Sequence, residues 1–327
     1  MNALCAAAVV VACLAVQASA KEGLPTDLSA EALAKAEASA KVGLPTEASA
    51  KVGEAQTRRV YVTAVDGSGA PVTDLTAADF AVKEGGKARE IVRSGPATGP
   101  IQIAILVDDN GTGIFRYAVG KFIESMLGRA EFAISTVTGQ LLRIVDYTPK
   151  AEALSEAIAK LNARPANNDG GQLLDAIAET ANDLEKRNAQ RPVILALTVG
   201  GEEHSTLPAH HVLDKLRQSG ASLNVLLVAN TALRSQSNPT TAAGLLGENM
   251  NLNEVLGDGP KQSGGRRQEI VAATGIASGL DQFADSLKHQ YLIEYTLPDG
   301  VKPSDKLSVT VTRKGVTVRA PSRIPDK

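Results

Sequence analysis

Long apolar runs in the middle of the chain predict the strands of a buried sheet. Residues 101–107, 192–198 and 222–229 are nearly continuous stretches of aliphatic side chains. Such runs are typical of parallel strands that are covered on both faces. Between them, apolar residues recur at helical spacing, as in Ile114, Ala118, Phe122 and Met126, in Leu173, Ile177, Ala181 and Leu184, and in Leu213 and Leu216. The alternation of strands and helices predicts an α/β domain over residues 100–289.

One edge of this sheet is expected to be antiparallel. Residues 132–137 and 141–145 are apolar runs on either side of Thr138-Gly139-Gln140. Two short apolar runs around a glycine-containing turn favour a hairpin. The fold class that follows is a doubly wound, mostly parallel sheet with helices on both faces.

The two ends of the folded region show a different pattern. Residues 58–97 and 290–327 contain short alternating segments separated by turns, such as 59–65 and 307–312. Neither end alone has enough strands to bury an apolar face. We therefore expect the ends to meet as a small immunoglobulin-like β-sandwich into which the α/β domain is inserted. The alternative is two separate sheets that flank it.

The first 57 residues are expected to lie outside the folded domains. Residues 1–20 combine an apolar stretch with Ala18-Ser19-Ala20, the small-residue pattern before a signal-peptidase cleavage site. Residues 21–57 repeat in decapeptides rich in Ala, Lys, Glu and Gly, a composition that favours a disordered tether. An alternative cleavage before Cys13 would leave a lipid-anchored cysteine. Both alternatives predict export to the periplasm or beyond.

Composition narrows the range of partners. The chain has 34 Lys and Arg against 36 Asp and Glu, so it lacks the basic excess expected for nucleic-acid binding. Only 3% of residues are aromatic and none is Trp, which removes the usual stacking platforms for bases. After the first segment, no apolar run reaches the about 18 residues needed to cross a bilayer. We expect a protein partner and no transmembrane segment in the mature chain.

Candidate chemistry lies where the first buried strand ends. Asp108 leaves that strand, and Asn110 and Thr112 follow at intervals of two residues. In a doubly wound sheet, ligands bind at the carboxyl ends of the strands. Three side-chain oxygens at this spacing could surround a small hard cation such as Mg²⁺.

This segment resembles the D-x-S-x-S signature of the von Willebrand factor A family. The resemblance covers residues 100–289 and implies a Rossmann-like fold with a metal-ion-dependent adhesion site, in which Mg²⁺ binds a partner's carboxylate. Carried over, the ligand positions fall on Asp108, Asn110 and Thr112. The family's threonine in the second loop is replaced by Gly171 or Gln172, and Val199 stands at the acidic position of the third loop. The resemblance therefore implies a degenerate site that holds Mg²⁺ weakly or not at all.

A narrower resemblance is to the exported proteins of acidobacteria that are related to this family. These carry V-x-V-x-V-x-D and then D-F-x-V-x-E-x-G before the A-like domain, and Q-Y-L-x-x-Y after it. Here Val60, Val62 and Asp66 match the first segment, and Gln290 and Tyr291 begin the last. The resemblance implies an exported binding or scaffolding protein.

The segment between the last strand and the last helix of the α/β domain is unusually long. Residues 230–267 are rich in Gly, Asn and Ser and exceed a usual connection. We interpret them as a mobile insertion that is either a partner-contacting loop or simply disordered. Leu252, Val255 and Leu256 also suggest a short amphipathic helix there.

Two hypotheses of function follow. The first is a protein-binding module without catalytic activity or a cofactor, which presents the surface around Asp108; a weak Mg²⁺-dependent adhesion protein is a variant of it. The second is a metal-dependent hydrolase that uses Asp108, Glu202 and Glu203. The sequence contains no G-x-S-x-G elbow and no phosphate-binding glycine loop, which favours the first.

Overall fold

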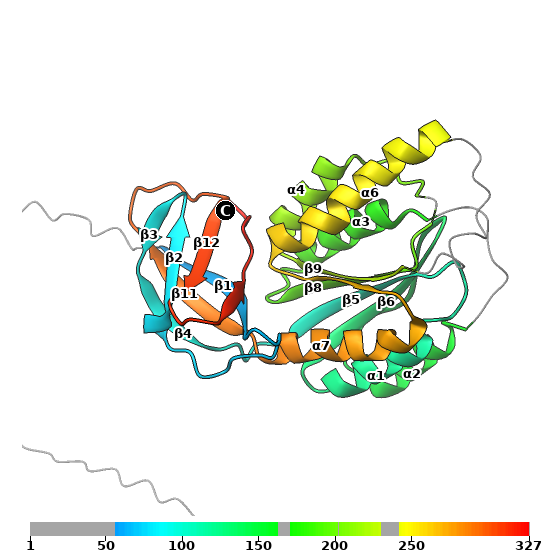
Figure 1. Cartoon of the computed structure of the whole chain (residues 1–327), viewed down its shortest axis with the longest axis horizontal. Helices are drawn as coiled ribbons and strands as arrows, with labels where there is room; N and C mark the ends of the chain where they lie inside the picture. The colour runs from blue at the N-terminus through cyan, green and yellow to red at the C-terminus, as the bar shows by residue number, and fades with distance from the viewer. Residues whose placement is uncertain (1–55, 163–170, 202, 230–241, 327) are drawn as a thin grey trace, which may run out of the picture. The chain divides into compact units, whose positions relative to one another are not determined.

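A computed structural model describes residues 56–162, 171–201, 203–229 and 242–326, all within the compact unit Gly53–Lys327. Figure 1 shows these residues in colour. The expected signal peptide, Cys13 and nearly all of the repeat segment lie outside the described residues. Their roles therefore stay predictions.

A six-stranded sheet forms the centre of the α/β domain. Its order is β10-β9-β8-β5-β6-β7. The strands are β5 (Ile101–Asp108), β6 (Ala130–Thr138), β7 (Gln140–Thr148), β8 (Pro192–Thr198), β9 (Ser222–Val228) and β10 (Arg267–Ile270). Every neighbouring pair is parallel except β6 and β7. The expected α/β class, the mostly parallel sheet and its antiparallel edge are confirmed.

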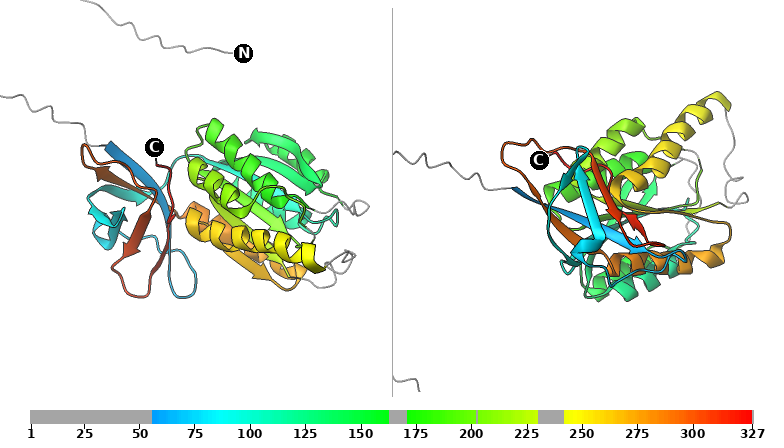
Figure 2. Two further views of the ribbon diagram at one scale, coloured as in Figure 1. Left: turned by 90° about the horizontal axis from the view of Figure 1, so that it is seen from above. Right: turned by 60° about the vertical axis from the view of Figure 1, so that its left-hand side comes forward.

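Helices cover both faces of this sheet (Figure 1, Figure 2). They are α1 (Arg116–Met126), α2 (Ala151–Ala159), α3 (Leu173–Lys186), α4 (Ala209–Ser219), α6 (Ala242–Ser263) and α7 (Ile276–Lys288). The short 3-10 helix η2 (Ala273–Gly275) precedes α7. One apolar cluster contains side chains of α1, α2 and α7, and a second contains those of α3, α4 and α6.

The apolar spacing read from the sequence corresponds to buried helix faces. Phe122 and Met126 of α1 are fully buried against the strands, as are Leu173 and Ile177 of α3. Burying a side chain of this size contributes about 1.5–3 kcal/mol. The sheet is therefore held between two apolar layers, and its strand ends carry the loops.

The expectation of a long mobile insertion over residues 230–267 is corrected for its second half, where the short helix suggested around Leu252, Val255 and Leu256 is part of a longer one. Residues 242–263 form α6, a helix of 22 residues, and β10 follows it directly. The physical reason is burial, because Val255 and Leu256 are 0% and 3% exposed in the cluster shared with α4. The amide of Ala209 at the start of α4 also donates to the Asn251 side chain at 3.3 Å. Residues 230–241 lie outside the described residues.

Strands from the two ends of the described chain pair with one another. The four-stranded sheet has the order β13-β1-β11-β4 and the three-stranded sheet the order β12-β2-β3. The strands are β1 (Gln56–Val65), β2 (Phe80–Glu84), β3 (Lys87–Arg89), β4 (Ile91–Pro96), β11 (Tyr291–Leu297), β12 (Leu307–Val311) and β13 (Thr317–Arg319). The 3-10 helix η1 (Ala77–Asp79) precedes β2. We call these the terminal sheets.

The terminal sheets share one apolar cluster. Val60 and Val62 of β1, Phe80 and Val82 of β2, and Ile293 of β11 are all buried in it. The rings of Phe80 and Tyr291 meet edge to face at 5.4 Å between centroids. The meeting of the two ends thus buries faces that each end alone would expose, while the immunoglobulin-like class stays a prediction.

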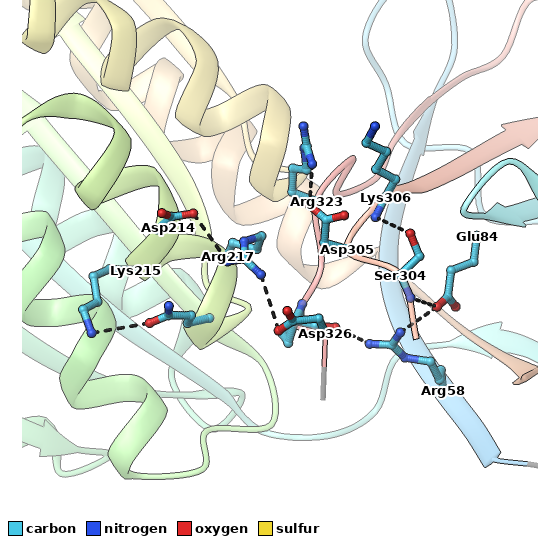
Figure 3. A network of polar contacts seen from close by, with 12 residues as sticks. Arg58, Glu84, Asp214, Lys215, Arg217, Ser304, Asp305, Lys306, Arg323 and Asp326 are labelled. Atoms are coloured by element: carbon cyan, nitrogen blue, oxygen red, sulfur yellow. Dashed lines mark hydrogen bonds and ion pairs between the residues drawn. The ribbon is translucent and has the colours of Figure 1, made fainter. Parts of the chain in front are cut away.

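The C-terminal segment, residues 320–326, contacts both the terminal sheets and the α/β domain. The Ser322 amide donates to the Gln262 carbonyl at the end of α6 at 2.9 Å, and the Ile324 amide donates to the Asp305 carbonyl at 2.8 Å. Figure 3 shows the side chains around it, with Arg217 of α4 paired to Asp326 at 3.4 Å. The segment therefore ties the last strands to α4 and α6.

Candidate functional site

The predicted site lies at the carboxyl ends of two neighbouring central strands. Asp108 ends β5 and Thr198 ends β8, and they face each other in the parallel register. The Thr198 hydroxyl donates a hydrogen bond of 2.6 Å to Asp108 Oδ2, and the Val199 amide donates to the Asp108 carbonyl at 3.1 Å. Asp108 is thus fixed from the neighbouring strand.

The environment of Asp108 favours its neutral form. Burial raises the pKa of this carboxyl to about 7, and nearby Glu203 and Asp109 add repulsion that acts in the same direction. The hydrogen bond from Thr198 lowers the pKa but does not offset burial. Desolvation of this kind disfavours a charged carboxylate.

Asp109 organises the loop after β5. This side chain is 4% exposed, and its Oδ1 and Oδ2 accept the amides of Gly111 at 3.0 Å and Gly113 at 2.7 Å. The loop needs left-handed backbone at Asn110, where φ is 50°, and at both glycines. An aspartate that accepts backbone amides two and four residues later is a recognised turn-forming device. Both oxygens of Asp109 are therefore used within the loop.

Two of the described residues, Gly171 and Val199, stand at positions in the second and third loops where the resemblance would place oxygen side chains. Gly171 lies against Asp108, since a Cβ added to it would be 3.2 Å from Asp108 Oδ1. Val199 is 2% exposed and belongs to the apolar cluster of α1 and α7. A glycine, which has no side chain, and a buried isopropyl group thus stand where the family has a hydroxyl and a carboxylate.

Glu203 caps helix α3. It is 4% exposed, its Oε2 accepts the Leu173 amide at 3.2 Å, and its Oε1 accepts the amides of Leu174 at 3.3 Å and Ser205 at 3.2 Å. The first amides of a helix have no partner within the helix, so a carboxylate there satisfies them and complements the helix dipole. Burial nevertheless raises the pKa of Glu203.

These contacts fit a resident Mg²⁺ poorly. Asp108 is fixed by Thr198, and the Thr112 hydroxyl is exposed and accepts the Ile114 amide at 3.4 Å. Among the residues that the structure describes, no three His, Cys, Asp or Glu side chains gather in a way that could hold a metal ion. Mg²⁺ requires nearly octahedral oxygen ligands. Glu202 lies outside the described residues, and a metal role for Asp108, Asn110 and Thr112 stays a prediction.

The structural roles of Asp109 and Glu203 were not predicted from the sequence. For Asp109, the spacing to Gly111 and Gly113 was a usable signal, because that pattern favours a turn closed by the carboxylate. For Glu203, no local signal exists, since the helix that it caps begins 30 residues earlier in the chain.

Removing the Glu203 carboxylate should destabilise the fold. We expect Glu203→Ala to lower the free energy of unfolding by about 2 kcal/mol, because the amides of Leu173 and Leu174 lose their acceptor. Glu203→Gln keeps an acceptor oxygen and should restore most of the loss. Urea unfolding of the three proteins measures both effects, and an unchanged midpoint for Glu203→Ala would exclude the capping role.

No family model matches the sequence, and no curated protein matches it. Similar solved structures include proximal thread matrix protein 1 from the mussel byssus, with 10% identity and a TM-score of 0.43 over 59% of this chain and 49% of that one. A von Willebrand factor type A structure from Catenulispora acidiphila has 14% identity and a TM-score of 0.42 over 84% and 76%. Manganese-loaded TRAP protein of Plasmodium vivax has 10% identity and a TM-score of 0.40 over 71% and 97%.

The chain spans about half the length of the byssus protein structure that it matches. All three structures have low sequence identity to this chain and low TM-scores.

Proposed function

We propose that this chain is an exported, non-catalytic protein-binding module of the von Willebrand factor A-like type. Its binding surface would be the edge of the six-stranded sheet where β5, β8 and β10 end. The observation that carries the proposal is that the described carboxylates at this edge are engaged by the protein itself: Asp108 by Thr198, Asp109 by its own loop and Glu203 by α3. Through these hydrogen bonds, the carboxylates stabilise the conformation of the loops.

Exposed apolar side chains at the same edge support a docking role. Tyr117, the second residue of α1, is 71% exposed, and Val271, which directly follows β10, is 79% exposed. Exposed aromatic side chains are enriched among the residues that dominate protein interfaces. A rigid set of loops that presents such side chains needs little reordering on binding, which favours affinity.

The competing proposal of a metal-dependent hydrolase has less support. A general base must be free to accept a proton from its substrate or from water. Glu203 instead accepts three backbone amides, and Asp108 Oδ2 accepts the Thr198 hydroxyl. A weak Mg²⁺-dependent adhesion site would require Asp108 to exchange the Thr198 hydroxyl for a metal ligand.

Export remains part of the proposal, on the strength of residues 1–20. Within the residues that the structure describes, no helix combines the length and the apolar character needed to span a bilayer.

The test is capture of a partner by variants of the proposed surface. The chain from Lys21 onward, immobilised and exposed to cell-envelope extract of the source organism, should retain a partner that the double variant Tyr117→Ser, Val271→Ser binds about tenfold more weakly. The matched control is Val92→Ser, because Val92 is 60% exposed but lies on β4 of the terminal sheets. Equal capture by the double variant, or equal loss in the control, would contradict the proposal.

A further inference from the structure

A cavity of about 330 Å³ opens at the opposite edge of the six-stranded sheet from Asp108, where β8 and β9 begin, next to β1 and the C-terminal segment. Its lining includes Tyr61, Pro192, Leu216, Ser222 and Ile324. This volume lies at the lower end of the range found for small-molecule sites.

The charges around this cavity have one sign. Arg59, Arg191 and Arg323 line it, and none of the described residues in its lining is acidic. Two of these arginines have carboxylate partners just outside the cavity. Arg59 pairs with Glu294 at 2.9 Å, and Arg323 pairs with Asp305. Arg191 is the exception.

Arg191 is a buried cation whose partners are neutral. It is 4% exposed, and it donates to the carbonyls of Gly99 at 2.8 Å and Leu287 at 3.1 Å and to Gln290 Oε1 at 2.9 Å. Its Nε has no acceptor, and the ring of Tyr61 lies 5.2 Å from the guanidinium. No carboxylate among the described residues pairs with it in the structure. Burial lowers the pKa of Arg191.

A buried charge without a counter-charge is costly, and such groups are normally paired or bound to a ligand. The carbonyls that surround Arg191 fix its position but do not neutralise it. An anion in the adjoining cavity would supply the missing charge. Arginine is also the side chain that best matches the planar fork of a carboxylate.

The rest of the lining indicates the shape of the anion. Leu216, Ala221 and Ile324 are buried apolar side chains on the wall of the cavity, and Ser222 adds a hydroxyl group. The hydroxyls of Ser219 and Ser263, also in the lining, bond to the backbone. We propose that this cavity binds a small organic carboxylate, with its oxyanion toward the arginines and its apolar body against Leu216 and Ile324. The site lies apart from the proposed protein-binding edge, and occupancy would bridge β1, β8 and the C-terminal segment.

Thermal unfolding with benzoate and its neutral, shape-matched analogue benzamide tests the proposal. The full chain should gain about 3–6 °C in Tm at ten times the Kd for benzoate, at constant ionic strength. Benzamide should give no shift, and inorganic phosphate, which has the charge without the apolar body, should give a smaller one. No shift with benzoate, or an equal shift with benzamide, would overturn the proposal.

Three variants locate the effect. Arg191→Gln should abolish the benzoate shift, and Ser222→Leu should abolish it by filling the cavity while Arg191 remains. Ser222→Leu decides the question if Arg191→Gln does not fold. Arg116→Gln, at an exposed arginine at the start of α1, should keep the full shift. A full benzoate shift in Ser222→Leu, or a lost shift in Arg116→Gln, would place binding elsewhere and refute the cavity.

Discussion

Replacing Asp108 with asparagine is expected to stabilise the protein above pH 7 and to flatten its pH dependence between pH 4 and 7. The pKa of Asp108 is raised by burial from 3.8 to about 7, so the folded state holds a proton there that the unfolded chain releases. The wild-type free energy of unfolding therefore falls as the pH rises through this range, in total by on the order of 4 kcal/mol. Asparagine has no proton to lose and can still accept from Thr198.

The sign of this effect separates the proposed account from a metal site. Denaturant unfolding at several pH values measures it as the difference in free energy between wild type and Asp108→Asn. Asp66→Asn is the control, because hydrogen bonds from Ser68 and Ala70 hold the pKa of Asp66 below its ordinary value. Asp66 therefore stays ionised over the range, and this variant should keep the wild-type slope. A less stable Asp108→Asn at pH 8 would mean that the fold uses the charged carboxylate.

The second large effect is expected at a buried ion pair in the terminal sheets. Arg58 of β1 and Glu84 of β2 form an ion pair of 2.8 Å, with side chains 9% and 0% exposed. Glu84 also accepts the Ser304 amide at 2.8 Å, and Arg58 donates to the Pro325 carbonyl (Figure 3). Glu84→Ala should lower the free energy of unfolding by about 3–5 kcal/mol, because it leaves Arg58 buried without its counter-charge.

Two further variants check that interpretation by calorimetric or urea unfolding. Arg58→Met combined with Glu84→Leu removes both charges and should recover much of the stability lost in Glu84→Ala. Glu294→Ala breaks the pair between Glu294 and Arg59, whose side chain is 65% exposed, and should cost about 1 kcal/mol or less. A loss in Glu84→Ala no larger than in Glu294→Ala would contradict the role of the buried pair.

The sequence predicted the central sheet because its strands are buried on both faces. β5, β8 and β9 are continuous aliphatic runs, which mark buried strands. The apolar residues of α3 recur at regular helical spacing, which marks a helix. The hairpin of β6 and β7 followed from the turn around Gly139, where φ is 74°. These sequence signals are local, and they are strong because the residues that carry them are buried and therefore apolar.

Elements with weaker local signals were predicted only in part or were missed. The segment that forms α6 contains Gly, Asn and an internal Pro260, all poor helix formers, and tertiary burial of Val255 and Leu256 overrides that preference. β10 has only four residues, and its side chains are exposed or half-buried, so no continuous apolar run marks it. Its pairing with β9 depends on contacts that sequence spacing does not reveal.

The position of Asp108 at the end of a buried strand was predicted, but its contacts were not. Asp108 was located because a polar residue ends a buried strand, and its partner Thr198 ends the neighbouring strand. The cap on α3 by Glu203 and the uncompensated charge of Arg191 arise from residues far apart in sequence. Such contacts exist only once the sheet order is fixed.

The central claim is that the carboxylates at the strand ends stabilise the conformation of the neighbouring loops through hydrogen bonds and that Asp108 is not a metal ligand. The most direct measurement is ¹³C NMR of aspartate side-chain carboxyls in the full chain over a pH titration, with and without millimolar MgCl₂. The account predicts that the Asp108 signal, assigned with Asp108→Asn, titrates near pH 7 and is unchanged by Mg²⁺. An Asp108 signal that titrates near pH 4 and shifts on addition of Mg²⁺ would contradict it.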